Sequence, residues 1–307
     1  MTLTNNIGQQ NCFNLVHTLK GHNASVYSIT FCDGYLYSAS SDKLIARWNI
    51  QTGEPDNFSI KLDAVPYIIK AIPEYSILII GLNNGLIHII DLNQKTEITS
   101  LKHHASAIFS IEINSIKGHI YIGDKDGNLS AWNINNWENL FSFNLDCGKI
   151  RDLKYVNAQN LLFVAKYNGE IGVYETEFYN EIKSIAAHKN GVSALAYNVD
   201  ERLIISAGKD AHIRYFNFEG QQIKSVPAHN YVIYGLETFN EGMNLSCSRD
   251  GSIKVWDRSF SKVLQKIDHK NIGHRHSVNE IIIIDNDCFA SCSDDKLIKV
   301  FQLSDDF

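Results

Sequence analysis

Short apolar segments separated by turn-forming residues recur along the whole chain. In the first group, residues 26–31 are followed by an Asp33-Gly34 turn, residues 35–40, a turn at Asp42 and residues 45–50. Segments of this length, rich in β-branched and aromatic residues and bounded by Gly, Asp or Asn, are typical of strands. Helical periodicity does not persist for about three turns anywhere, so the pattern predicts an all-β protein.

The turns recur with an almost constant spacing. Each unit has an Asp or Asn six positions before an aromatic or large apolar residue. The pairs are Asp42 with Trp48, Asn84 with Ile90, Asp126 with Trp132, Asn168 with Tyr174, Asp210 with Phe216, Asp250 with Trp256 and Asp295 with Phe301. Successive turn residues are 42, 42, 42, 42, 40 and 45 positions apart. Seven such units, each with four short strand patterns, predict a repeat architecture.

The sixth unit carries a full set of motif residues. Residues 228–257 run from His229 through Ser246 and a turn at Asp250 to Trp256-Asp257. This unit resembles one repeat of the WD-repeat β-propeller family, and the resemblance covers about residues 13–303. It implies an all-β, seven-bladed β-propeller of four-stranded antiparallel blades.

The resemblance also implies how the ring closes. In the family, an N-terminal strand completes the last blade, and residues 13–19 have the length and alternation to do so. We therefore expect them to pair beside residues 296–303, which removes the two sheet edges that an open array would expose. Residues 12–307 are predicted to form one domain, after a polar tail at residues 1–11 that we expect to be frayed.

The family assigns a structural role to the histidines that open several units. There, this His joins the turn Asp, a strand Ser and the strand Trp in a buried hydrogen-bond relay. The fifth and seventh units, which open with His188 and His274, have Phe in place of Trp, so we expect their relays to end at Ser206 and Ser291. Complete sets are His22, Ser38, Asp42 and Trp48, and His229, Ser246, Asp250 and Trp256.

Three units depart from this pattern. The third keeps His104, Asp126 and Trp132 but has Ile122 at the serine position. The second and fourth units are assigned to blades by spacing and apolar pattern. Their His positions hold Ala64 and Asp146, their turn positions Asn84 and Asn168, and their Trp positions Ile90 and Tyr174.

Because the relay accounts for the His, Ser and Asp residues, we predict no catalytic triad. His269, His274 and His276 could suggest a metal, but His274 belongs to a relay and no Cys or carboxylate lies at ligand spacing. Residues 124–128 resemble a calcium loop only faintly and lack its later ligands. No Gly-rich phosphate motif is present. The sequence predicts no catalytic residue, no metal and no cofactor.

Composition narrows the classes of ligand and the cellular compartments to be considered. The chain is 44% hydrophobic and 20% charged, with a net charge of −6, so bulk charge does not favour binding to polyanions. The N-terminus lacks the features of a signal peptide, and the apolar runs are too short to span a membrane. The six scattered cysteines favour a reducing compartment, and Cys288 and Cys292 are too far apart on one strand to bridge. We predict a cytoplasmic, monomeric protein.

The resemblance directs attention to the face around the central channel, where partner peptides often dock in this family. Its lining comes from the residues three and five positions after the opening His, and from the residue before the turn Asp. The partner-binding candidates so obtained are Tyr27, Tyr67, Ile69, Phe109, Lys125, Lys149, Arg151, Tyr167, Lys209, Tyr234, Arg249 and Asp294.

This set is biased toward basic and aromatic residues, with Asp294 as its one acid. Aromatic and arginine side chains commonly anchor interfaces, and arginine binds carboxylate or phosphate groups bidentately. We therefore expect a non-catalytic scaffold that binds an acidic or phosphorylated segment of a partner protein on this face. The alternatives are a nucleic-acid binder that uses the same face and an enzyme with a site at the channel mouth.

Overall fold

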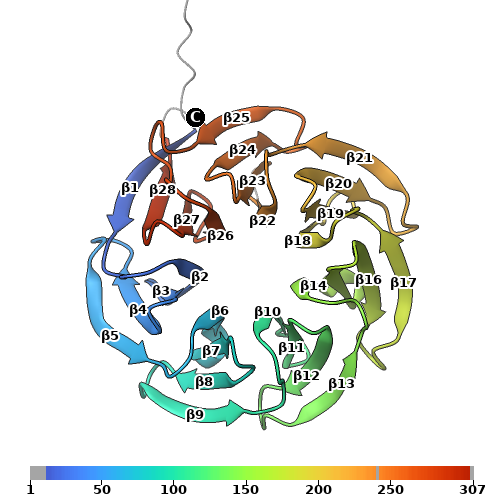
Figure 1. The fold of residues 1–307 in the computed structure, drawn as a ribbon, viewed down its shortest axis with the longest axis horizontal. Coiled ribbons are helices and arrows are strands. Elements are labelled where there is room, and N and C mark those ends of the chain that lie inside the picture. The colour runs from blue at the N-terminus through green and yellow to red at the C-terminus, as the bar shows by residue number, and fades with distance from the viewer. Residues whose placement is uncertain (1–11, 240–241, 305–307) are drawn as a thin grey trace, which may run out of the picture.

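The computed structural model describes residues 12–239 and 242–304, whose strands form seven four-stranded antiparallel sheets arranged in a ring (Figure 1). This confirms the seven-bladed propeller that the repeat spacing predicts. The proposed tail at residues 1–11 and the last three residues of the predicted domain lie outside the described residues. Two single-turn 3-10 segments, η1 (Pro73–Tyr75) and η2 (Asn157–Gln159), connect strands.

Each blade runs from an inner strand at the central channel to an outer strand at the rim. The inner strands are β2 (Val26–Cys32), β6 (Pro66–Ile72), β10 (Ile108–Asn114), β14 (Ile150–Val156), β18 (Val192–Asn198), β22 (Ile233–Thr238) and β26 (Val278–Ile283). The second strands are β3 (Tyr35–Ser40), β7 (Ile77–Leu82), β11 (His119–Asp124), β15 (Leu161–Lys166), β19 (Leu203–Gly208), β23 (Met243–Ser248) and β27 (Cys288–Ser293).

The blades are numbered one to seven in the order of these inner strands. The third strands are β4 (Leu44–Asn49), β8 (Ile87–Asp91), β12 (Asn128–Asn133), β16 (Glu170–Glu175), β20 (His212–Phe216), β24 (Ile253–Asp257) and β28 (Ile298–Leu303). The outer strands of blades one to six are β5 (Pro55–Lys61), β9 (Thr96–Leu101), β13 (Asn139–Asn144), β17 (Glu181–Ala186), β21 (Gln222–Pro227) and β25 (Val263–Ile267), and blade seven takes β1 (Phe13–Leu19).

Packing between blades explains the apolar runs of the sequence. Seven buried clusters lie between neighbouring blades, as where Tyr37 and Ile45 of blade one meet Ile69 and Ile80 of blade two. Second strands such as β7, β23 and β27 are covered on both faces and buried throughout. Outer strands such as β13 alternate between half-buried and exposed residues. This is the difference expected between strands packed on two faces and strands at a rim.

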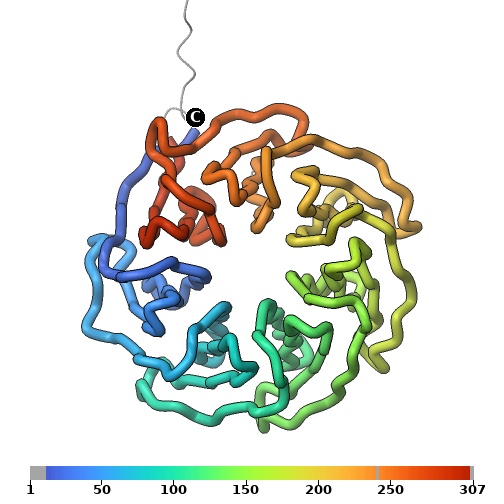
Figure 2. Tube along the Cα trace, viewed as in Figure 1, coloured from blue at the N-terminus to red at the C-terminus, as the bar shows by residue number. Residues whose placement is uncertain are grey.

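Strand β1 closes the ring by pairing antiparallel with β28, as predicted (Figure 2). Gln265, on the outer strand of blade six, reinforces this seam. Its side-chain oxygen accepts a hydrogen bond from the Phe13 backbone at 2.7 Å, and its amide donates to the Phe13 carbonyl at 2.9 Å. Phe13 is fully buried against Phe289 of blade seven. The last blade is therefore held by the two ends of the described chain and by its neighbour.

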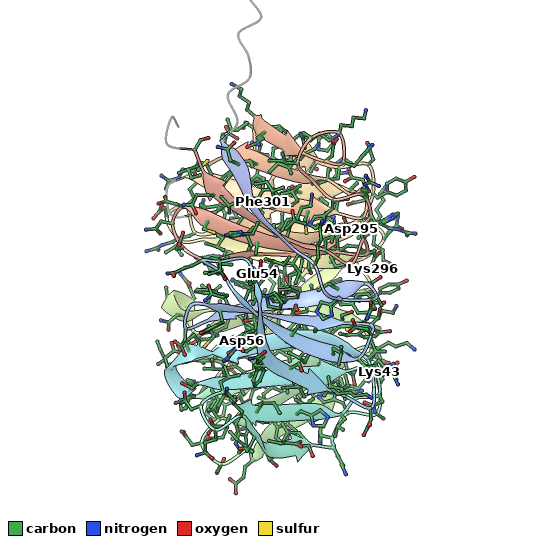
Figure 3. All side chains as sticks on the ribbon, turned by 90° about the vertical axis from the view of Figure 1, so that its left-hand side faces the viewer. Lys43, Glu54, Asp56, Asp295, Lys296 and Phe301 are labelled. Carbon is green, nitrogen blue, oxygen red and sulfur yellow. The ribbon has the colours of Figure 1, made fainter. Side chains whose placement is uncertain are left out.

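The turns between second and third strands lie on one side of the disc, which we call the top face. Figure 3 shows Lys43 and Lys296, from two such turns, toward the same side, whereas Glu54 of the β4–β5 connection lies away from it. At this turn, blade two has Gly85 with φ of 86°, and an added Cβ would lie 2.3 Å from the His104 carbonyl oxygen. Gly85 is therefore required by the close approach of blade three.

Candidate functional site

The relays of blades one and six have the geometry that the family resemblance implies. In blade one, His22 Nδ1 lies 2.9 Å from Asp42 Oδ2 and His22 Nε2 lies 2.8 Å from Ser38 Oγ. The Trp48 indole N–H donates to the same Ser38 Oγ at 2.8 Å. Blade six repeats these contacts with His229, Ser246, Asp250 and Trp256.

Blades five and seven hold the His, Ser and Asp contacts without an indole. His274 lies 3.0 Å from Asp295 and 2.9 Å from Ser291, and Phe301 is buried beside them. In blade five, Arg214 donates to Asp210 at 2.6 Å and also contacts His188. The arginine adds a charged donor to the carboxylate where the sequence pattern predicted only a shortened relay.

The relays lower the pKa of their aspartates, and burial lowers the pKa of two of their histidines. Burial by itself would raise the pKa of Asp295, but hydrogen bonds from His274 and from the Arg275 and Leu297 backbone outweigh it and lower the pKa to about 2. Burial lowers the pKa of His229 and His274, and the neighbouring Asp offsets this only in part. A histidine held in this way between a carboxylate and a hydroxyl fixes the top turn to the blade, and this is a structural role.

Blade three contains a complete relay, but from different residues than the pattern selects. His104 Nδ1 lies 2.9 Å from Asp124 Oδ2, and His104 Nε2 lies 2.8 Å from Ser130 Oγ, which also accepts the Trp132 indole N–H at 2.8 Å. The prediction of Asp126 as the relay carboxylate is wrong, since Asp126 is exposed.

The carboxylate and the hydroxyl of this relay lie at different sequence positions than in the other relays, for a simple geometric reason. Asp124 precedes Asp126 by two residues at the end of β11 and is fully buried. Ser130 is the cross-strand partner of Ile122, the position where the other blades carry their serine. The hydroxyl therefore crosses to the neighbouring strand while remaining within reach of His104. A Ser two residues before a Trp is the sequence pattern that could have revealed this arrangement.

Blade four replaces the relay with an ion pair that the sequence analysis missed. Lys166 ends β15, at the position that Asp124 occupies in blade three, and is 4% exposed. Its ammonium lies 2.6 Å from Glu181 of the outer strand and 5.6 Å from the centre of the Tyr174 ring. The pair is partly open to solvent at Glu181, which reduces its cost of burial.

Blade two has no relay, and its His88 instead contacts the exposed Glu97 of the outer strand at 2.8 Å. Its alignment also differs from the prediction. In every blade, the residue before the top turn donates its backbone N–H to the carbonyl of the residue just before the inner strand, from Ser41 to Ser25 in blade one and from Asn83 to Val65 in blade two. Tyr67, two residues after Val65, therefore corresponds to Tyr27. Ile69 is buried in the cluster between blades one and two, so its predicted place on the binding face is wrong. Without an opening His, nothing in the sequence marked where the count along blade two should begin.

A bulge near the start of every inner strand builds the mouth of the channel. The pairing register slips at the second residue of each inner strand, for example between Val26 and Ser28 in blade one. A bulged residue is left out of the ladder and its side chain is re-aimed. The seven bulged residues are Tyr27, Tyr67, Phe109, Arg151, Ser193, Tyr234 and Asn279. All seven line one funnel of about 950 Å³.

Aromatic rings occupy the mouth along blades one to three. The Tyr27 and Tyr67 rings meet edge to face at 5.3 Å between centroids, and Tyr67 stacks on Phe109 at 5.6 Å. The Arg151 guanidinium then lies 4.9 Å from the centre of Phe109 and 5.8 Å from that of Tyr234. The structure thus brings these five predicted residues together in one row of contacts.

Two lysines continue this row outward over blades four and five. The Lys149 ammonium lies 5.7 Å from the centre of Phe109 and 5.6 Å from that of Tyr167. The Lys209 ammonium lies 3.7 Å from the centre of Tyr167. A hydrogen bond from Lys209 and the positive charges of both lysines lower the pKa of the Tyr167 phenol. Arginine and lysine cations are attracted to ring faces, so the rings hold these charges in place.

The other predicted residues lie around this row. Arg249 and Asp294 line the funnel, and Lys125 is exposed on the same top face. Asp294 accepts a hydrogen bond from Asn279 at 3.0 Å and is thereby engaged within blade seven. Among the described residues, Lys125, Lys149, Arg151, Lys209 and Arg249 form no ion pair with a carboxylate.

Deeper in the funnel, the charges are of both signs and satisfy one another. Lys70 lies 4.0 Å from Glu112, and the charge of Glu112 raises the pKa of Lys154. Asp152 and Glu280 accept backbone N–H groups of the next blade at 2.7 and 2.6 Å, from Leu195 and Ile29. Burial raises the pKa of both carboxyls to about 7. These wall residues join blades, in contrast to the unpaired cations above them.

The described part of the chain contains no group of three or more His, Cys, Asp and Glu residues placed to hold a metal ion. None of its helical segments is long and apolar enough to cross a membrane. All six cysteines are buried and carry free thiols.

A family model described as "WD domain, G-beta repeat" matches residues 13–49, 179–217, 220–257 and 265–302. The chain is a member of the WD-repeat β-propeller family. Each match joins an outer strand, or part of one, to the three inner strands of the following blade, namely blades one, five, six and seven. Blades two and three and the three inner strands of blade four lie outside the matched segments.

Curated WD-repeat propeller relatives share the repeat at low identity. The chain is 23% identical to human WD repeat-containing protein 36 over 85% of its own length and 30% of that protein. It is 21% identical to mouse striatin, over 92% of this chain and 41% of striatin. It is 22% identical to the Arabidopsis thaliana U3 snoRNP-associated protein-like EMB2271, over 89% and 51%. The chain spans about a third to half of the length of these relatives.

Proposed function

We propose that this propeller is a non-catalytic interaction scaffold that binds an acidic segment of a partner protein across the mouth of its channel. The observation that carries the proposal is the set of five cations on the top face that have no carboxylate partner among the described residues. Unpaired cations beside aromatic rings are a common arrangement for anchoring an anionic ligand.

The arrangement of the relay His, Ser and Asp residues supports a non-catalytic role, although these residue types also occur in hydrolases. Their hydrogen bonds are directed to one another inside each blade, and the serines of the relays are fully buried. A nucleophile needs access to a substrate. One relative is named for its association with a ribonucleoprotein, which favours a role within an assembly. With six free buried thiols, we propose a reducing compartment such as the cytoplasm.

The test is a quantitative comparison of proteins retained from native lysate by the wild type and by Arg151→Glu/Arg249→Glu. A matched control, Arg202→Glu/Lys262→Glu, reverses two exposed charges outside the funnel. We expect the variant to lose its partners, the control to keep them, and carbodiimide crosslinks, which join amines to carboxylates, to link Lys149 or Lys209 to an acidic segment. Retention of every partner by the top-face variant would refute the proposal.

Nucleic acid is the competing ligand for a basic and aromatic surface. Treating the lysate with ribonuclease separates the two, since a protein segment would still be retained. Loss of all partners after this treatment, together with a steep dependence of binding on salt, would favour a nucleic-acid binder.

A further inference from the structure

One row of side chains at the mouth alternates rings and cations. Its members, which we call the cation ladder, are Tyr234, Arg151, Phe109, Lys149, Tyr167 and Lys209. Each neighbouring pair in this order is in cation–ring contact, with 3.7 to 5.8 Å between the cation and the ring centroid. The ladder therefore gathers three positive charges over blades four and five.

The ladder cations are less completely neutralised than the cations of the funnel wall. Neighbouring cations in the ladder share a ring, so the ring faces offset part of their mutual repulsion, and the charge of Asp152 also favours the charged form of Arg151. Burial lowers the pKa of the Arg151 guanidinium, while the wall lysine Lys154 has its pKa raised by Glu112. The wall cations thus have anionic neighbours within the protein, and the ladder cations have no described ion-pair partner. The ladder is therefore suited to binding an anionic ligand.

The arrangement favours a dianion over a single carboxylate. A phosphate on a side chain carries between about −1.5 and −2 charges at neutral pH and has three acceptor oxygens. Arginine can engage two of these oxygens with its fork, and lysine ammonium groups can approach the third. A glutamate offers one charge and two oxygens, which leaves part of the ladder unpaired.

The rings are poorly placed to bind bases. Phe109 contacts Tyr67, Arg151 and Lys149, so little of its surface is left for stacking. Tyr167 is likewise flanked by Lys149 and Lys209. Single-stranded nucleic acids depend on free ring faces for stacking. These contacts favour a peptide over RNA as the source of the phosphate.

On the basis of the proposed function, we propose that the cation ladder binds a phosphorylated side chain of the partner segment and distinguishes it from an acidic one. The Arg151 guanidinium provides the bidentate contact, and Lys149 and Lys209 approach from the outer side. The Tyr27 and Tyr67 rings, next along the mouth, contact an apolar side chain close to the phosphorylated residue in the segment.

The test uses an array of short peptides in matched triplets that differ at one position, which holds phosphoserine, serine or glutamate. Dissociation constants of the best triplets are then measured by fluorescence anisotropy. We expect the phosphorylated peptide to bind roughly tenfold or more tightly than its glutamate counterpart. Arg151→Lys, which keeps the charge and removes the fork, should lower this preference roughly tenfold, and Lys209→Gln should lower it as well. The matched control Arg202→Lys, outside the funnel, should leave it unchanged.

The outcomes separate this inference from the proposed function. Equal binding of phosphoserine and glutamate peptides, lost in Arg151→Glu/Arg249→Glu, would overturn the phosphate site and leave the acidic interface standing. Absence of binding to every acidic and phosphorylated peptide would overturn both. Tight binding of a uridine oligonucleotide that displaces the phosphopeptide would assign the ladder to nucleic acid. A phosphate preference that survives Arg151→Lys and Lys209→Gln would place the site elsewhere.

Discussion

Blades two and three are neighbours with nearly the same backbone, yet their interiors are stabilised by opposite chemistry. Blade three joins His104, Asp124, Ser130 and Trp132 in a buried polar relay. Blade two fills the corresponding space with aliphatic side chains, with Ile80 at the serine position and Ile90 at the tryptophan position. The backbone geometry of a blade therefore does not require the relay.

The two solutions differ in how they respond to change. A buried polar network is stable only when each member has its partners, because an unpaired polar group in the interior is costly. An aliphatic interior loses stability in proportion to the apolar volume removed. The stability of blade three should thus depend on the chemical identity of single polar atoms. The stability of blade two should depend on the volume of its buried side chains.

The largest effect is expected for Asp124→Ala. It leaves the His104 imidazole and the Asn128 amide without their acceptor and should lower the free energy of unfolding by about 3 to 4 kcal/mol. Asp126→Ala, which alters the exposed residue that the sequence pattern selects, should change it by less than about 0.5 kcal/mol. Denaturant unfolding of both variants measures the difference. Equal losses would contradict the assignment of Asp124 to the relay.

A pH titration examines the charge within the same relay. Burial would raise the pKa of Asp124, but hydrogen bonds from His104 and Asn128 lower it to about 2. Because the unfolded value is near 4, the ionised carboxylate adds stability above about pH 4 that is lost as the pH falls toward 2. The unfolding free energies of wild type and Asp124→Asn should therefore differ by about 2 kcal/mol more at pH 6 than at pH 2. A difference that does not change with pH would show that the pKa of Asp124 is the same in the folded and unfolded states.

Trp132→Phe tests the end of the relay. Blades five and seven keep their His, Ser and Asp contacts with Phe216 and Phe301 at this position. The variant should lose the indole hydrogen bond and some packing, for a cost of about 1 to 2 kcal/mol. The His104 ring N–H should remain visible by NMR as a slowly exchanging proton. A loss as large as that of Asp124→Ala would mean that the indole is essential to the network.

The smallest effect is expected in blade two. Ile80→Val removes one buried methylene group and should cost about 1 kcal/mol. Ile98→Val, at a 44% exposed position of the outer strand, serves as its control and should cost less than about 0.5 kcal/mol. A cost above about 3 kcal/mol for Ile80→Val would show that the aliphatic interior is as intolerant as the relay.

The same comparison explains what the sequence could predict. Strand positions follow from a spacing that is imposed on the backbone, so blade two can be located although it has no opening His. The closing pair of strands is instead implied by the family resemblance. The relay of blade three was misassigned because Asp124 and Asp126 lie two residues apart and both could face the turn. Which carboxylate reaches His104 depends on side-chain contacts across strands, as does the pairing of Lys166 with Glu181.

At the mouth of the channel, too, the sequence predicts positions along the chain but not the contacts between side chains. Five of its seven bulged residues are among the candidates chosen by their distance to the opening position, but Tyr67 is reached only from a misplaced opening position in blade two. Ile69 was selected wrongly because blade two has no His from which to count. The alternation of rings and cations could not be predicted, since its members come from strands and turns of four different blades. These residues lie close together only because the blades are arranged in a ring.

Because β1 closes the ring, the propeller can be completed only at the end of its biosynthesis. Phe13 pairs with Leu303, so the first strand of the described chain leaves the ribosome long before its partner exists. At typical rates of translation, the interval is roughly 15 to 60 s. During that time Phe13, which is fully buried among residues of blades six and seven in the finished protein, has no blade to cover it. Until synthesis is complete, the nascent chain is an open arc with one uncovered apolar strand. In this state it is most accessible to chaperones and proteases.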